Sequence, residues 1–178
     1  MKIAHQSGRA VVVVEDQVVD IATASDGRFG PDPAQIFDQW DDFTDFAKTL
    51  PSPTGPLRVQ DLGSPAPTPR QVFAIGLNYR QHADEAGMTP PEFPAVFTKF
   101  PASLSGPNDP IEAVGQTTDY EVELVAVIGR RADRVAANSA WNHIAGLTVG
   151  QDISDRTLQI AAGKQFSMGK SRRGYGPM

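Results

Sequence analysis

Length, composition and charge already exclude several classes of protein. The chain has 178 residues, a formal net charge of −5 and no cysteine. Disulfides, thiolate metal ligands and cysteine nucleophiles are therefore excluded, and an acidic chain without a long basic run is not expected to bind nucleic acid. No apolar run approaches the length of a membrane span, and the N-terminal residues lack the apolar core of a signal peptide. We therefore expect a cytoplasmic protein with no membrane partner.

The first part of the chain predicts a small α/β lobe over residues 1–50. Residues 10–14 and 17–22 have the composition of two strands around a tight turn. Asp32 followed by Pro33 is typical of a helix start. The apolar residues that follow at three- and four-residue steps predict one amphipathic helix over residues 33–50. Prolines then recur through residues 51–69, which predicts an extended linker rather than a helix.

The second part of the chain predicts strands alternating with short helices. Apolar, β-branched runs predict strands at residues 71–77, 95–100, 119–128 and 147–153. Helical spacing and capping residues predict helices at residues 80–86, 136–143 and 154–162.

The strand at residues 119–128 carries an unusual charge pattern. Alternate residues of a strand share a face, so Glu121 and Glu123 point the same way, about 6.6 Å apart. From Glu123 onward both faces are apolar, which predicts a central strand covered on both sides. Two carboxylates entering such an interior are costly unless a cation compensates them.

A divalent metal ion is one way to compensate these charges. Asp152, at the end of the strand at residues 147–153, could complete a set of oxygen ligands with Glu121 and Glu123. Such a set favours Mg²⁺, with Mn²⁺ or Ca²⁺ as alternatives, over Zn²⁺. From the spacing alone, two solvated glutamates at a strand end explain the pattern equally well.

Other polar side chains are candidates for acid–base chemistry and for anion binding. His82 and Glu85, three apart on a predicted helix, share a face. A carboxylate beside an imidazole raises its basicity, so the pair could activate water, although an ordinary surface pair is the commoner interpretation. Lys99 and Lys170 are candidate cations for an anionic substrate.

Five segments in order resemble the motifs of the fumarylacetoacetate hydrolase family. They span residues 75–85, 96–99, 119–129, 151–156 and 169–171. The resemblance is to bacterial members such as 2-hydroxyhepta-2,4-diene-1,7-dioate isomerases and acylpyruvate hydrolases. It implies an α+β, mostly β fold: a curled mixed β-sheet, or β-roll, over residues 70–178, with a small N-terminal α/β lobe. Compared with the family, this catalytic domain is expected to be incomplete at its C-terminus.

The resemblance also implies roles for individual residues. The metal, Mg²⁺ first, is expected on Glu121, Glu123 and Asp152. The expected catalytic residues are His82, Glu85 and Lys170, and the expected substrate-binding residues are Tyr79, Lys99 and Arg156.

The implied chemistry is that of a metal-dependent, homodimeric enzyme of aromatic-compound catabolism. Its substrates are 2-oxo or 1,3-dicarbonyl carboxylic acids, which undergo carbon–carbon hydrolysis, decarboxylation or isomerisation through an enolate. The alternative is a non-catalytic metal-binding or scaffolding fragment of the same fold.

Overall fold

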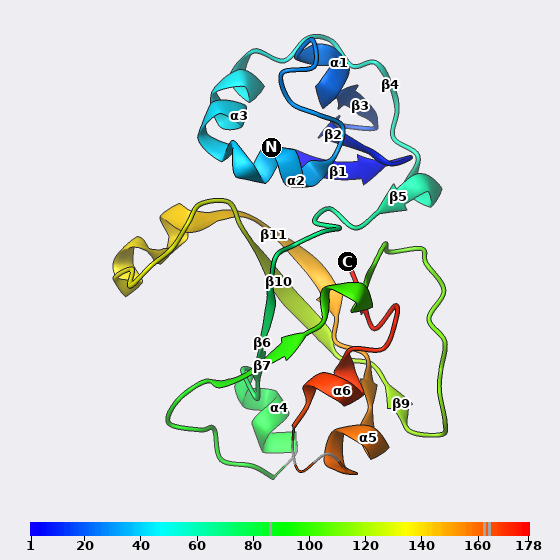
Figure 1. The fold of residues 1–178 in the computed structure, drawn as a ribbon, viewed down its shortest axis with the longest axis vertical. Coiled ribbons are helices and arrows are strands. Elements are labelled where there is room, and N and C mark those ends of the chain that lie inside the picture. Colours follow the sequence, from blue (N-terminus) through cyan, green and yellow to red (C-terminus); the bar gives the residue numbers. More distant parts are fainter. Residues whose placement is uncertain (86, 162, 164) are drawn as a thin grey trace.

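The computed structural model describes residues 1–85, 87–161, 163 and 165–178 of the chain (Figure 1). A small N-terminal lobe lies at one end of the long axis, and a strand-rich body with short helices makes up the rest. Short sheets curl around one another in this body. The predicted α+β, mostly β class is therefore confirmed.

The N-terminal lobe is built on a five-stranded antiparallel sheet in the order β4-β3-β2-β1-β5. Its strands are β1 Lys2–Gln6, β2 Arg9–Val14, β3 Gln17–Asp20, β4 Gly55–Pro56 and β5 Leu62–Gly63. The predicted turn between β2 and β3 is present, with Glu15 at a positive φ of 57°. Both edge strands come from the proline-rich stretch predicted as a linker, so residues 55–63 extend the sheet of the lobe.

Short helices cover one side of this sheet. They are α1 Ile21–Ala24, α2 Pro33–Asp38, α3 Trp40–Phe46 and the 3₁₀ turn η1 Ala47–Thr49. Asp32 caps α2 through Ala34 N–H, as predicted. The single helix predicted over residues 33–50 is instead broken at Gln39, whose φ of −125° and ψ of 38° are not helical. The break lets both segments turn their apolar faces to one core, where Ile36 and Phe43 are fully buried.

The body of the molecule is formed by residues 70–178. Its strands are β6 Val72–Gly76, β7 Ala95–Lys99, β8 Leu104–Ser105, β9 Thr118–Asp119, β10 Val122–Ile128, β11 Ile144–Gln151, β12 Ser154–Asp155 and β13 Gly176–Pro177. Its helices are α4 Arg80–Glu85, α5 Arg156–Ala161 and α6 Ser167–Lys170, and its 3₁₀ turns are η3 Pro101–Ser103 and η4 Ala137–His143. A further 3₁₀ turn, η2 Val59–Asp61, precedes the body. The predicted last residues of two helices, Ala86 and Ala162, lie outside the described residues.

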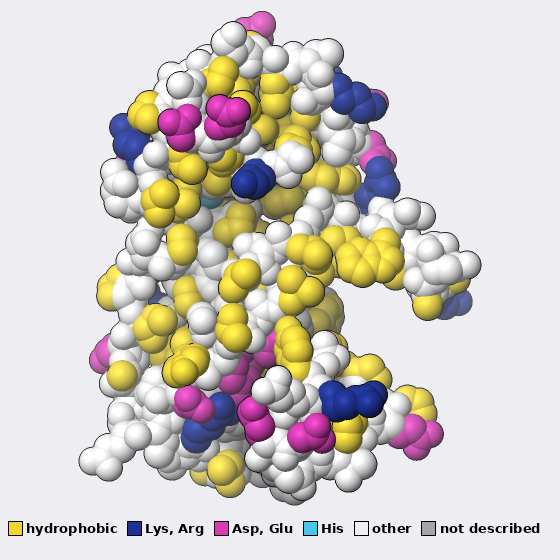
Figure 2. Space-filling model, turned by 180° about the vertical axis from the view of Figure 1, so that it is seen from behind, with side chains coloured by type: hydrophobic (Ala, Val, Ile, Leu, Met, Phe, Trp, Pro, Cys, Tyr) yellow, Lys and Arg dark blue, Asp and Glu magenta, His cyan; other side chains and the backbone are white. Residues whose placement is uncertain are grey.

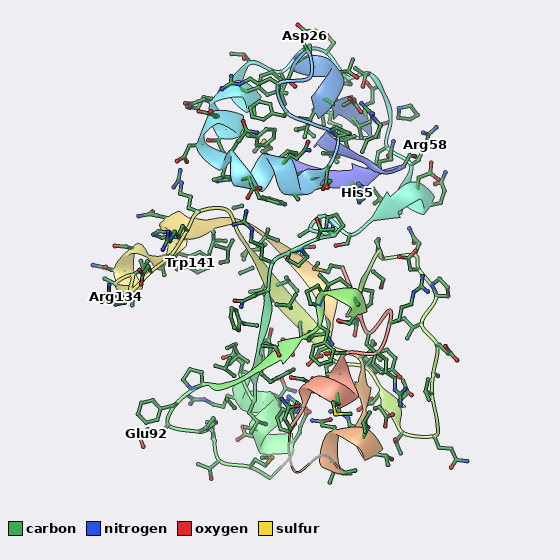
Figure 3. All side chains as sticks on the ribbon, in the orientation of Figure 1. His5, Asp26, Arg58, Glu92, Arg134 and Trp141 are labelled. Carbon is green, nitrogen blue, oxygen red and sulfur yellow. The ribbon has the colours of Figure 1, made fainter. Side chains whose placement is uncertain are left out.

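Two antiparallel pairs, β6–β7 and β10–β11, dominate the body. The turn η4 connects β10 to β11 and projects from the body, carrying Trp141 at its exposed side (Figure 3). In the part of the chain that the structure describes, no helix is long and apolar enough to cross a membrane.

The strand predicted over residues 119–128 differs from the prediction in two ways. It is interrupted at Tyr120 and Glu121, between β9 and β10. The prediction that both faces are covered is also wrong, because the face of β10 that carries Val122 and Leu124 is open to solvent, and Leu124 is 61% exposed. Alternating apolar residues show that a face can be buried but do not show what covers it.

Candidate active site

A change of strand partner brings two acidic side chains together. β9 pairs with β12, whereas β10 pairs with β11. At the junction between these ladders, Asp152 N–H donates to the Glu121 carbonyl at 2.8 Å. The end of β11 and the break between β9 and β10 therefore bring Asp152 and Glu121 next to each other.

Lys170, the last residue of α6, provides the central cation of this cluster. Its Nζ donates to Glu121 Oε2, Asp152 Oδ2 and Ser154 Oγ, each at 2.8 Å. The residue is only 3% exposed, and its ammonium group lies 5.5 Å from the centre of the Phe97 ring. Charge-assisted hydrogen bonds in such a buried place are stronger than neutral ones. Lys170 therefore compensates both carboxylates.

Lys99, at the end of β7, holds Asp152 from the other side. Its Nζ donates to Asp152 Oδ1 at 2.6 Å and to the carbonyls of Tyr175, at 3.0 Å, and Lys170. Burial lowers the pKa of Lys99, and the Asp152 carboxylate opposes that effect. An ammonium group has three donors, and these three partners use them all. This arrangement positions Asp152 and leaves Lys99 no donor for the substrate contact that the sequence predicted.

Arg156, at the start of α5, orients the remaining oxygen of Glu121. Its guanidinium donates to Glu121 Oε1 at 2.6 Å and to Asp119 Oδ2 at 2.7 Å. Burial acts to raise the pKa of Glu121, but the hydrogen bonds and charges of Lys170 and Arg156 outweigh it and hold that pKa below its usual value. Glu121 is therefore kept ionised.

Glu123 differs from the other two carboxylates of the predicted metal site. Burial raises its pKa, the charges of Glu121 and Asp152 raise it further, and the neighbouring Tyr79 opposes both effects. The Tyr79 hydroxyl also accepts from Leu124 N–H at 3.1 Å, which fixes Tyr79 against β10. Glu123 therefore interacts electrostatically with the other two carboxylates. Among the described residues, no lysine or arginine is bonded to it.

The predicted acid–base pair lies on α4, outside the bonded cluster. His82 is partly buried, Glu85 is exposed, and Glu85 accepts a hydrogen bond from Gln81 at 3.1 Å. In the part of the chain that the structure describes, no hydrogen bond joins His82 to Glu85. Their role in activating water stays a prediction.

The chemistry of the donor set suits an oxygen-seeking divalent cation, because three carboxylates interact electrostatically here. As the side chains lie, however, no three His, Cys, Asp or Glu residues of the described chain are grouped closely enough to hold a metal ion. Lys170 lies between two of the three carboxylates instead. The structure therefore brings Glu121, Asp152 and Lys170 together and leaves the metal site a prediction.

The segment that forms this cluster matches a known family model. The model for the C-terminal domain of fumarylacetoacetate hydrolase matches residues 71–178, which is more than half of the chain. The chain belongs to the fumarylacetoacetate hydrolase family.

Individual members of the family are similar over most or nearly all of the chain. A crystal structure of an HpcE-like protein from Mycobacterium smegmatis superposes with a TM-score of 0.92 and 46% identity, covering 99% of this chain and 64% of that one. A fumarylacetoacetate hydrolase domain-containing protein 2 homolog from Dictyostelium discoideum is 33% identical over 99% of this chain and 60% of its own length. The mitochondrial oxaloacetate tautomerase Fahd2a of Rattus norvegicus is 35% identical over 65% of this chain and 37% of its own length. The chain spans less than two thirds of the length of each relative.

Three residues of the cluster were not found from the sequence. Ser154 follows Asp152 by two positions, and its hydroxyl donates to the Asp152 carbonyl at 2.9 Å while accepting from Lys170. Its position suggested only a helix cap. Tyr175 contributes a backbone carbonyl, and Phe97 contributes a ring face to the ammonium group of Lys170. Neither contribution leaves a signal in local sequence patterns.

Proposed function

We propose that this cluster is the active site of a metal-dependent enzyme acting on 2-oxo or 1,3-dicarbonyl carboxylic acids. The observation that carries the proposal is the buried Lys170 ammonium group, bonded at 2.8 Å to both Glu121 and Asp152. Burying these charges is costly, and apolar residues in place of a buried ion pair are often as stable or more stable, so folding alone does not explain the cluster. Membership of the family, whose relatives include a tautomerase of the 2-oxo acid oxaloacetate, supports the substrate class.

In this proposal Glu121, Glu123 and Asp152 would hold the divalent cation, with Mg²⁺ as the first candidate. When bound, the cation supplies Lewis-acid stabilisation of the negative charge that develops on the substrate oxygens. Ionised Glu121 matches this role, because Lys170 and Arg156 hold its pKa low. Glu123, whose own charge is unfavourable in the metal-free protein, would gain most from the cation.

The other residues of the cluster position these groups or contribute charge. Lys170 would act on an enolate oxygen through its buried charge and not through a hydrogen bond, because its three donors are bonded to Glu121, Asp152 and Ser154. Lys99 and Arg156 fix the orientations of Asp152 and Glu121. We assign Tyr79, whose hydroxyl accepts from Leu124 N–H, to contact with a substrate oxygen.

His82 and Glu85 would act in the hydrolytic form of the reaction. There, the imidazole takes a proton from water as the water attacks the carbonyl distal to the carboxylate, and Glu85 stabilises the imidazolium that forms. The carbon–carbon bond then breaks, and the enolate leaves with the electron pair. Decarboxylation and isomerisation pass through the same enolate, so one set of residues serves all three reactions. We also propose that the enzyme works as a homodimer.

Turnover measurements on a small panel of acids test this function. Oxaloacetate and acetylpyruvate are followed by ultraviolet absorbance with Mg²⁺ or Mn²⁺, for the unmodified chain and for Lys170→Met. We expect metal-dependent turnover of at least one acid and a loss of about 10²–10³-fold in Lys170→Met. Lys48→Met, on an exposed pair with Asp45, is the matched control and should leave turnover unchanged. Equal turnover in the unmodified chain and Lys170→Met, or no turnover of any acid with either metal, would contradict the proposal.

A further inference from the structure

The N-terminal lobe has a pocket on the side of its sheet that the helices do not cover. Ala10 and Val12 belong to the core under the helices, so Val11, between them on β2, points to the opposite side. Val18 of β3 shares that side, because it pairs with Val13. The pocket has a volume of about 290 Å³, and Val11 and Val18 line its apolar floor.

Residues 54–58 form the opposite wall of this pocket. Their strand, β4, pairs with β3. Gln6, only 7% exposed, donates through its side-chain amide to the Pro56 carbonyl at 3.3 Å and accepts from Arg58 N–H at 2.7 Å. Because this buried amide is bonded through both its nitrogen and its oxygen, it holds the wall in place. The pocket is therefore a fixed feature of the lobe.

Two arginines at the mouth of the pocket have donors left for a ligand. Arg9 uses Nε and Nη2 to bind Asp20, with Nη2 at 2.8 Å from Oδ1. Arg58, at the edge of the lobe (Figure 3), places Nε at 2.8 Å from Asp61 Oδ2. A guanidinium has five N–H donors. Among the described residues, no hydrogen bond involves Arg9 Nη1 or either Nη atom of Arg58, and such donors suit a carboxylate.

The lobe carries charges of both signs. Seen from behind, basic, acidic and hydrophobic side chains are interspersed over its surface (Figure 2). A field of one sign is therefore not what would attract an anion here. Recognition would depend on the individual arginine donors above the valine floor.

We infer that this pocket binds a small organic acid, whose carboxylate accepts from Arg9 and Arg58 while its apolar body lies on Val11 and Val18. Its volume of about 290 Å³ is near the lower end for ligand pockets, about 300–1,000 Å³, so the acid is small. The lining residues lie within residues 6–58, whereas the family model matches residues 71–178. The inference is therefore independent of the proposed reaction.

Titration of benzoate into the isotope-labelled 178-residue chain, followed by two-dimensional NMR, tests this site. We expect the backbone amide signals of Gln6, Ser7 and Thr54, which line the pocket, to move with a Kd of about 1 mM. Benzamide has nearly the same shape without the negative charge. It should bind at least about fivefold more weakly, because it cannot form charge-assisted hydrogen bonds with the arginines.

An arginine variant and its matched control test the charged contact. Arg58→Gln removes the guanidinium but keeps the backbone N–H that holds Gln6, so the lobe should stay folded and bind benzoate at least about fivefold more weakly. Arg28 is 55% exposed and also pairs with one aspartate, Asp42. Because Arg28 does not line the pocket, Arg28→Gln should bind benzoate as the unmodified chain does.

A second variant fills the pocket. Gly55 pairs with Val18, so a side chain at Gly55 would point to the same side of the sheet. A Cβ there would meet no heavy atom within 4 Å. Gly55→Leu should therefore fold and lose benzoate binding.

Several results would overturn the inference. They are no movement of the signals of the lobe at about 20 mM benzoate, equal binding of benzamide, and equal weakening by Arg58→Gln and Arg28→Gln. Unchanged binding by Gly55→Leu, or movement confined to signals around Lys170, would also overturn it.

Discussion

Removing the Lys170 ammonium group should destabilise the protein strongly. In Lys170→Met the side chain keeps its approximate length, but Glu121 Oε2 and Asp152 Oδ2 lose their shared donor. Removing one partner of a buried ion pair costs about 3–5 kcal/mol. Because Asp152 keeps Lys99 and Glu121 keeps Arg156, we expect a value near the lower end, about 3 kcal/mol. For a chain of 178 residues, this corresponds to a fall in Tm of about 6–12 °C.

Differential scanning calorimetry at pH 7 in the presence of a chelator measures this effect without any contribution from metal. Lys48→Met removes an exposed lysine that pairs with Asp45 and should leave Tm nearly unchanged. If Lys170→Met melts at the same temperature as Lys48→Met, the bonds in the cluster do not stabilise the fold, and the account of a compensated buried cluster is refuted.

Three further predictions follow from other groups. Asp20→Asn should lower the free energy of unfolding at pH 7 by up to about 1 kcal/mol, because the Arg9 hydrogen bond holds the Asp20 pKa far below its usual value. Urea titrations should show the difference between the two proteins shrinking as pH falls below about 4. A difference that stays constant with pH would contradict this prediction. Glu123→Gln should raise the Tm of the metal-free protein at pH 7, since burial raises the Glu123 pKa and its charged form opposes folding. The stability linked to that raised pKa is present at low pH and lost as pH rises. Melting curves in chelator should therefore show that the Tm advantage of the variant vanishes toward pH 4. Phe43→Ala, in the fully buried core and edge-on to Phe29, should cost about 3–5 kcal/mol, measured by chemical denaturation, and a loss below 1 kcal/mol would argue against this core.

Sequence patterns located the acidic part of the site because each carboxylate lies on or directly beside a strand with a clear apolar pattern. Glu121 and Asp152 were assigned to strands whose ends meet, and the structure brings them together. The partners of Asp152 were not accessible in this way. Lys99 and Lys170 are 71 residues apart in sequence, yet the amine of one donates to the carbonyl of the other. Such contacts arise only from tertiary packing.

The N-terminal lobe and β10 show two further limits of sequence patterns. Amphipathic spacing predicted the buried face at residues 33–50 but not the break at Gln39, because the break depends on how two short segments fit one core. The alternation along β10 showed that both faces are apolar, as in a buried strand. It carried no information about the exposure of the face of Leu124, which is open to solvent.

Isothermal titration calorimetry of a divalent cation tests the central claim most directly. Mg²⁺ and Mn²⁺ are titrated at pH 7 into the metal-free chain and into Glu123→Gln. We predict binding of one cation per chain, weakened at least about tenfold in the variant, because a neutral amide replaces one of three anionic ligands. Equal binding by both proteins, or no binding by the unmodified chain, would contradict a metal site formed by Glu121, Glu123 and Asp152.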